Sequence, residues 1–163
     1  LEHKMLYDET GEVPDRPYAT PFGEARVVRE GGDAVIVALG RMVGRAEAAA
    51  RTLAAEGIQA AIVDPRTTSP LDHGTILEYA EETGRVVVVD EASPRCGMAA
   101  DIASLVAERA FDALKAPILK VTPPHTPVPY SPVLEDAYLP DAARIARAVR
   151  RSVAHRAARG GRA

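Results

Sequence analysis

Two apolar runs that flank a helical pattern constrain the fold of this chain more than any other feature of its sequence. Residues 60–63 are wholly apolar and end in Asp64, and residues 86–89 are four valines followed by Asp90 and Glu91. Unbroken apolar runs are typical of parallel strands whose two faces are covered by helices. The pattern therefore predicts a β-α-β unit with polar side chains at the carboxyl ends of its strands, where ligands of such sheets usually bind.

The alternation of strand and helix patterns continues along most of the chain. The helical patterns stop at glycines, Gly57 and Gly84 among them, which is typical of helix C-termini. The predicted strands are 25–29, 34–39, 60–63, 86–89 and 118–121, and the predicted helices are 42–56, one that follows Asp72, 98–109 and one that follows Asp141. This order predicts an α/β fold of three layers, α/β/α, around a five-stranded, mixed and mostly parallel sheet. We expect 86–89 to be the central strand and the half-polar 25–29 to be a short antiparallel edge strand.

Composition divides the chain into three parts. Residues 1–23 contain several Pro and Gly and no periodic pattern, which predicts an extended linker, and residues 24–153 form the predicted α/β domain. Residues 154–163 are rich in Ala, Arg and Gly and are predicted to be a disordered basic tail. Because the chain begins with Leu1, we expect a processed product, a cloned fragment or a piece of a longer protein.

The charge distribution excludes some classes of partner. Seven arginines and no acidic residue lie from Arg144 onward, so a chain of net charge −3 has a body of about −10. An acidic body argues against a nucleic-acid partner, and no aromatic side chain lies between the C-terminal arginines for base stacking. These arginines are expected to complement the dipole of the last helix. A single cysteine and the lack of any apolar stretch of transmembrane length favour a cytoplasmic protein without a membrane partner.

Polar residues follow four of the predicted strands and form a candidate rim. Gly40 and Arg41 follow one strand, Asp64 and Arg66 the next, Asp90 and Glu91 another, and His125 the last. Carboxylates, two arginines and a histidine on one rim could bind an anion or a metal ion. In the alternative interpretation, Asp64 and Asp90 cap neighbouring turns and pair with Arg66 and Arg95.

The sequence contains no established catalytic motif. Gly40 and Gly44 do not form a dinucleotide-binding pattern, a phosphate-binding loop is absent, and the four histidines lack metal-ligand spacing. A receiver-type domain would need an acidic pair near the first core strand. That strand ends in Leu39 and Gly40 instead, so the receiver class is excluded. Cys96 precedes a helix, where either a reactive thiol or a small turn residue would fit. We therefore assign this chain no catalytic, cofactor-binding or metal-binding residue.

Three ordered stretches of the chain carry a family resemblance. They are DPRTTSPLD (64–72), VVVVDEASPRCGMAADIASLVAERAFDAL (86–114) and VTPPHTPVPYSPVLEDAYLP (121–140). The chain resembles, over about residues 1–153, the C-terminal transketolase-like domain of E1 β subunits of thiamine-diphosphate-dependent 2-oxo acid dehydrogenases. Within this family, the PRCGMAADIA and PHTPVPYS segments are most similar to acetoin dehydrogenase β subunits. Transketolases and related synthases, whose C-terminal domains share the fold, are a more distant alternative.

The resemblance implies a partial enzyme. In this family the α subunit holds the thiamine diphosphate and Mg²⁺, and a glutamate of the preceding pyrimidine-binding domain activates the cofactor; the chain contains neither motif. Alone, it is expected to bind no cofactor and to be inactive, with residues 1–23 leading from a missing pyrimidine-binding domain. The full α2β2 enzyme would oxidatively decarboxylate or cleave acetoin, pyruvate or a branched-chain 2-oxo acid and transfer the acyl group to the lipoyl groups of E2.

The expected partners follow from the same resemblance. They are the E1 α subunit, a second β subunit and the E2 acyltransferase, although the C-terminal arginines depart from the family pattern and leave the E2-docking residues unassigned. His3 and His125 are candidates for the approach to the active site, with ordinary turn hydrogen bonds as the alternative. A free-standing α/β module that binds a small anion or a protein, without catalysis, is the competing hypothesis.

Overall fold

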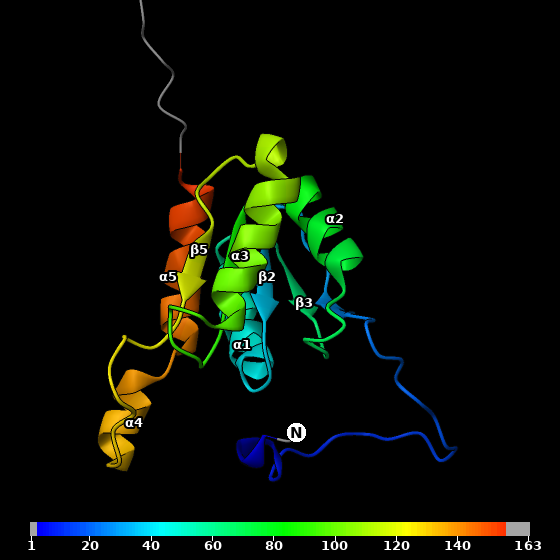
Figure 1. The fold of residues 1–163 in the computed structure, drawn as a ribbon, viewed down its shortest axis with the longest axis vertical. Helices are drawn as coiled ribbons and strands as arrows, with labels where there is room; N and C mark the ends of the chain where they lie inside the picture. The colour runs from blue at the N-terminus through cyan, green and yellow to red at the C-terminus, as the bar shows by residue number, and fades with distance from the viewer. Residues whose placement is uncertain (1–2, 156–163) are drawn as a thin grey trace, which may run out of the picture.

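The computed structural model describes residues 3–155 as a sheet covered by helices on both faces (Figure 1). Five strands, five α-helices and two short 3-10 helices alternate along this part of the chain. The elements are η1 (Lys4–Leu6), β1 (Arg26–Arg29), β2 (Ala34–Ala38), α1 (Met42–Ala55), β3 (Ala60–Asp64), α2 (His73–Thr83), β4 (Val86–Val89), α3 (Met98–Arg109), η2 (Phe111–Ala113), β5 (Leu119–Val121), α4 (Pro132–Tyr138) and α5 (Ala142–Val153). The predicted three-layer α/β fold is confirmed.

The sheet has the strand order β1-β3-β2-β4-β5. β1 pairs with β3 in the antiparallel sense, and the other three pairings are parallel, as predicted. The prediction that 86–89 is the central strand is wrong, because β2 occupies the centre and β4 lies between β2 and β5. Both strands are fully buried, so an unbroken apolar sequence does not distinguish the central strand from its neighbour.

Alternate residues of the strands divide the core into two layers. Ile36 and Val87 point toward α1 and α5, whereas Val35 and Val88 point toward α2 and α3. This division follows from the two-residue period of a strand, which sends successive side chains to opposite faces. Every residue of β2 and β4 therefore packs against a helix, and neither strand contributes to the surface.

Helix ends follow the capping signals of the sequence. The side chain of Asp72 accepts a hydrogen bond from the Thr75 N–H at 3.0 Å, and that of Asp141 accepts one from the Arg144 N–H at 2.6 Å. Both are side-chain caps of a helix N-terminus. Gly57 after α1 and Gly84 after α2 have left-handed backbone angles (φ 82° and 67°).

The sequence analysis did not anticipate helix α4. It follows the Pro-rich loop after β5 and projects away from the sheet beside α5 (Figure 1). Its own residues supply the missed signal, because Ser131 stands at the N-cap and Pro132 at the first helical position. α4 has no buried residue, so the apolar periodicity used to find the other helices does not apply to it.

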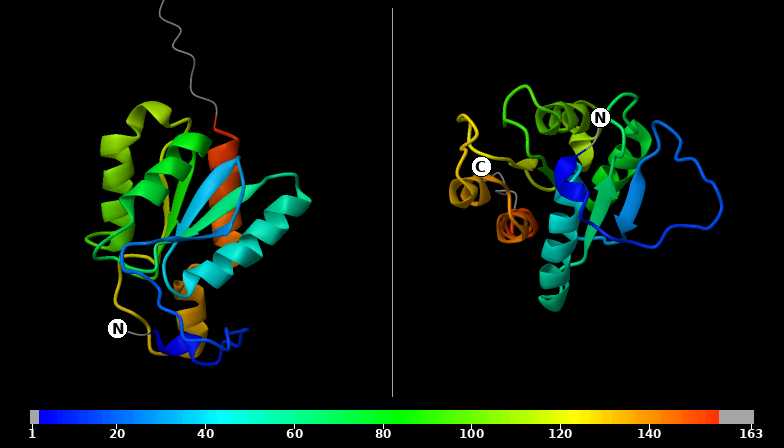
Figure 2. Two further views of the ribbon diagram at one scale, coloured as in Figure 1. Left: turned by 90° about the vertical axis from the view of Figure 1, so that its right-hand side faces the viewer. Right: turned by 90° about the horizontal axis from the view of Figure 1, so that it is seen from below.

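The segment before β1 is largely exposed. It begins at the carboxyl end of the sheet with η1, and residues 8–22 swing away from the sheet before the chain returns to β1 (Figures 1 and 2). The assignment of residues 1–23 as a linker remains a prediction. Of the predicted tail, residues 156–163 lie outside the described residues. Among residues 3–155, no helix combines the length and apolarity needed to cross a membrane.

The two helix-terminating glycines provide a matched test of this packing. A Cβ atom at Gly84 would lie 2.6 Å from the Ala113 carbonyl oxygen, whereas one at Gly57 would meet no atom within 4 Å. We expect Gly57→Ala to cost about 1 kcal/mol from left-handed strain alone, and Gly84→Ala about 3 kcal/mol because a steric clash is added. Urea unfolding of both variants measures the difference; equal losses would contradict the close approach of residues 113–115 to the end of α2.

Candidate functional site

The four parallel strands end at one edge of the sheet, here called the carboxyl edge. It comprises the segments after β2, β3, β4 and β5, residues 39–41, 64–68, 90–96 and 122–125. All six candidate residues lie on or against this edge; the parallel topology brings five of them there, and His3 reaches it from the N-terminal segment. The structure distributes them over separate groups, one around Glu91, one around Asp64 and one around His125.

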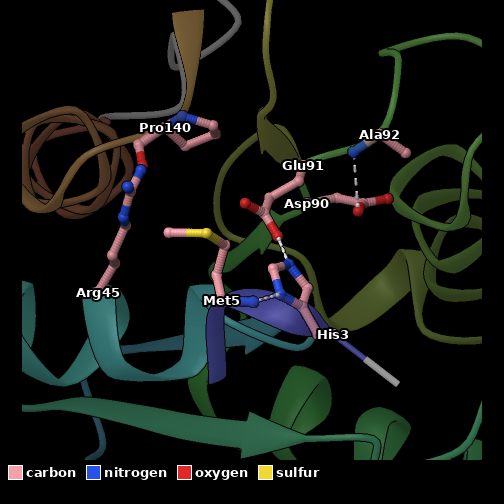
Figure 3. A network of polar contacts seen from close by, with 7 residues as sticks. All are labelled: His3, Met5, Arg45, Asp90, Glu91, Ala92 and Pro140. Atoms are coloured by element: carbon pink, nitrogen blue, oxygen red, sulfur yellow. Dashed lines mark hydrogen bonds and ion pairs between the residues drawn. The ribbon is translucent and has the colours of Figure 1, made fainter. Parts of the chain in front are cut away.

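His3 and Glu91 form the most direct contact between candidate residues. His3 Nε2 lies 2.5 Å from Glu91 Oε2, and this bond ties the segment before η1 to the end of β4 (Figure 3). His3 Nδ1 also accepts a hydrogen bond from the Met5 N–H at 3.3 Å. A ring nitrogen that accepts a hydrogen bond carries no proton. In this arrangement the proton is therefore on Nε2, which donates a hydrogen bond to the Glu91 carboxylate.

Asp90, at the same strand end, accepts hydrogen bonds from the backbone that follows it. Its side chain is only 8% exposed. One carboxylate oxygen accepts from the Ala92 N–H at 3.0 Å (Figure 3). The other accepts from the Ala99 N–H at 3.4 Å, near the start of α3. These hydrogen bonds agree with the alternative interpretation, in which Asp90 caps the neighbouring turn. The ion pair expected between Asp90 and Arg95 is not formed; the ion pairs among the described residues are His3–Glu91 and Glu56–Arg150.

Asp64 and Arg66 line a second part of the edge, a cavity of about 610 Å³. Asp64 Oδ1 accepts the Arg66 N–H at 3.0 Å, and Arg66 adopts a left-handed backbone (φ 58°). Burial raises the pKa of Asp64, and the Arg66 hydrogen bond and the charges of Arg66 and Arg26 only partly offset this rise. The cavity is also lined by Arg41 from the start of α1 and by Leu6 and Glu9 from the N-terminal segment.

His125 belongs to a third group, on the loop after β5. Its Nδ1 lies 2.8 Å from Ser93 Oγ, so the bond links the loops after β4 and β5. Cys96 lies nearby in sequence to Ser93, is exposed and has a left-handed backbone (φ 56°) just before the N-cap of α3. Its thiol is therefore not buried in the turn, contrary to the interpretation of Cys96 as a filling residue.

Arg41, which the sequence placed on the rim directly after β2, connects two cavities of this edge. It lines both the 610 Å³ cavity and a neighbouring cavity of about 320 Å³ that contains His3 and Glu91. The second cavity also contains Glu135 and Asp136 of α4. These two acids were not predicted from the sequence, because they reach this edge only through the tertiary path of the loop before them.

The carboxyl edge does not fit a metal-diphosphate group. Within residues 3–155, no set of three or more His, Cys, Asp or Glu side chains is arranged to hold a metal ion. The acids are separated into different cavities, and Asp90 and Glu91 already accept hydrogen bonds from within the chain.

The fold and this edge define a class of protein, the C-terminal domains of transketolase-like enzymes. The sequence matches the family described as "Transketolase, C-terminal domain" over residues 23–145, and the chain belongs to this family.

The relatives of this chain include β subunits of acetoin oxidoreductases and of pyruvate dehydrogenase E1 components. The chain is 62% identical over 93% of its length to the β subunit of acetoin:2,6-dichlorophenolindophenol oxidoreductase of Cupriavidus necator, and 51% identical over 86% to that of Bacillus subtilis. It is 40% identical over 92% of its length to the pyruvate dehydrogenase E1 component subunit beta of Rhizobium meliloti. It spans 45%, 41% and 33% of these three proteins, so less than half of each. The resemblance to E1 β subunits is confirmed.

A solved structure has the same architecture. A split-gene transketolase described as an inactive β4 tetramer matches 90% of this chain and 47% of its own, with a TM-score of 0.76 and 31% identity. A 2-oxoglutarate:ferredoxin oxidoreductase matches 80% of this chain and 19% of its own at a TM-score of 0.51 and 16% identity, which shows the fold alone.

The bond between His3 and Glu91 predicts a local effect. His3→Ala or Glu91→Ala should accelerate amide exchange of Leu6 in η1 about fivefold, the equivalent of about 1 kcal/mol for a half-exposed bond to a carboxylate. Glu135→Ala, in the same cavity but without a bond to His3, is the matched control and should leave this exchange unchanged. Hydrogen exchange read by NMR tests this, and an equal effect of all three variants would refute the tether.

Asp64 and Asp72 predict opposite pH dependences. Burial opposes ionisation of Asp72 too, but hydrogen bonds from Ala25 and Thr75 outweigh it and lower its pKa. The raised pKa of Asp64 means that its ionised form is unfavourable in the folded chain. Ionisation of Asp64 therefore lowers the free energy of unfolding as pH rises above 3.8, the ordinary pKa of an aspartate. The lowered pKa of Asp72 adds stability above the ordinary 3.8, and this is lost as pH falls through its folded-state pKa.

Asparagine variants of Asp64 and Asp72 test these two opposite pH dependences of stability. From about pH 3 to about pH 7, Asp64→Asn should gain stability relative to the parent chain, and Asp72→Asn should lose it. Denaturant unfolding across this range checks the prediction, and parallel curves for the two variants would contradict it.

Proposed function

We propose that this chain is the C-terminal domain of the β subunit of an acetoin dehydrogenase-type E1 component. The observation that carries the proposal is the 62% identity to an acetoin oxidoreductase β subunit over 93% of the chain, together with the match to the transketolase C-terminal family. Identity falls to 40% for the pyruvate dehydrogenase β subunit of Rhizobium meliloti, which favours acetoin as the substrate of the whole enzyme.

In the proposed whole enzyme, thiamine diphosphate and Mg²⁺ supply the cleavage chemistry. The enzyme cleaves the substrate oxidatively and passes the acyl group to lipoyl groups of E2. Since the carboxyl edge does not fit the cofactor, the role of this domain is assembly with the E1 α subunit, a second β subunit and E2, in the cytoplasm. Its 610 and 320 Å³ cavities then contribute the wall of a site whose reacting groups lie on other domains.

Exposed apolar side chains support an assembly role. Large apolar residues of soluble proteins normally lie buried, and contiguous exposed ones mark contact surfaces. The loop after β5 and α4 expose Val128, Tyr130, Val133 and Leu134, with exposed fractions of 66%, 102%, 78% and 58%. The N-terminal segment exposes a second set, Met5, Leu6, Tyr7, Val13, Tyr18 and Phe22. Both sets begin at the carboxyl edge, so one partner surface can contact them there.

A free-standing small-anion module is the second candidate. The 610 Å³ cavity favours it, because two basic residues, Arg41 and Arg66, line this space. Under this hypothesis, phosphate or small carboxylates stabilise the chain in a thermal-shift screen, and Arg41→Gln removes the stabilisation.

Subunit association tests the assembly proposal directly. We expect the full chain to co-purify with an acetoin dehydrogenase E1 α subunit, and Val133→Ser/Leu134→Ser to weaken the complex at least tenfold, since each side chain would lose about 1–3 kcal/mol of apolar burial. Phe111→Ser is the matched control, because Phe111 is 70% exposed but lies in η2, away from the carboxyl edge. No association of the parent chain, combined with stabilisation by phosphate, would favour the anion module instead.

A further inference from the structure

Helix α5 lies beside β5, the edge strand at the other end of the sheet from β1 (Figure 1). A basic groove is lined by residues of these two elements. It has a volume of about 400 Å³, and its lining contains four cations and no acid. The lining residues are Leu119, Lys120, Val121, Arg144, Arg147, Ala148 and Arg151. The chain as a whole has a net charge of −3, so this groove is a local reversal of sign.

The arginines of the groove differ in what they bind. Arg144 donates to the carbonyl oxygens of Thr122 at 2.6 Å and Tyr138 at 3.3 Å, which fixes the path of the chain beside β5. Arg147 and Arg151 are exposed, and neither side chain has a hydrogen-bond or ion-pair partner among residues 3–155. Arg150, on another face of the same helix, is paired with Glu56. Two guanidinium groups of α5 are therefore available to an external acid.

The backbone of β5 adds a second recognition element. β5 pairs with β4 on one side and with no strand on the other. The Val121 carbonyl accepts the Asp90 N–H at 3.2 Å, so the backbone groups of Val121 face β4. Backbone groups of successive strand residues point to opposite sides, which directs the N–H and C=O of Lys120 outward along the free edge. An unpaired edge of this kind is a template for an additional strand.

We propose that this groove binds an extended acidic peptide segment of a partner protein, which adds a strand to β5 and pairs its acidic side chains with Arg147 and Arg151. The spacing supports this pairing: residues four apart rise about 6 Å along a helix, and side chains on one face of a strand repeat at about 6.6–7 Å. Strand addition provides main-chain hydrogen bonds, and the arginines select acidic side chains at alternate positions.

Other anionic ligands fit this groove less well. A nucleic acid would gain no base stacking, since no aromatic side chain lines the groove, and its phosphates would face the acidic remainder of the molecule. A single phosphate or carboxylate would use the arginines but not the free strand edge. An extended peptide satisfies both elements at once.

The test uses the full 163-residue chain and a fluorescein-labelled peptide, Thr-Glu-Val-Glu-Val-Glu-Thr-Gly, read by fluorescence anisotropy at low salt. Arg147→Glu/Arg151→Glu should weaken binding at least tenfold. Arg51→Glu/Arg109→Glu, at exposed arginines outside the groove, is the charge-matched control and should change binding less than twofold. N-methylation of the second valine, which removes one backbone donor without changing charge, should also weaken binding at least tenfold.

Several outcomes would overturn the proposal. They are no binding of the peptide, equal losses for the Arg51/Arg109 and Arg147/Arg151 variants, insensitivity to N-methylation, full competition by millimolar inorganic phosphate, tighter binding of an oligonucleotide, or a dimer in sedimentation that the Arg147/Arg151 variant alone dissociates. Arg147→Gln/Arg151→Gln serves if the glutamate variant unfolds, and it should give a smaller loss of the same kind.

Discussion

The rest of the structure depends on the parallel pairing of β2 with both β3 and β4. Because helices bury both faces of these strands, their side chains are almost wholly apolar, and polar groups are displaced to the strand ends. Parallel direction then brings those ends to one edge of the sheet. The two cavities, the His3–Glu91 bond and the buried Asp90 carboxylate all arise there for this reason.

The two outer strands make the sheet asymmetric. β1 is antiparallel to β3 and places Arg26 opposite Asp64, so a cation stands beside the carboxylate whose pKa burial raises. β5 is only three residues long, and its free outer edge lies beside the arginines of α5. A domain that is acidic overall thus has apolar side chains and charges of both signs at its carboxyl edge and a basic surface along β5. In the proposed subunit these surfaces serve different contacts.

Local signals predicted most of the fold. Helices begin at the N-caps Asp72 and Asp141 and end at Gly57 and Gly84. These signals act within a few residues, so they can be recognised in the sequence. The order of the strands is a different kind of property, since β2 and β4 have equally apolar sequences and only long-range pairing makes β2 central. α4 escaped the periodicity test because it buries no side chain, although Ser131 and Pro132 marked its start.

The candidate site shows the same division. The sequence by itself determined that Asp64, Arg66, Asp90, Glu91 and His125 lie on one edge, because strand direction alone brings them there. Only the tertiary structure decided that His3 reaches Glu91 across 88 positions of sequence, that Asp90 is committed to the turn before α3, and that Arg147 and Arg151 stand beside a free strand edge. These facts depend on packing between distant segments, and the free energy of such contacts leaves no local pattern in the chain.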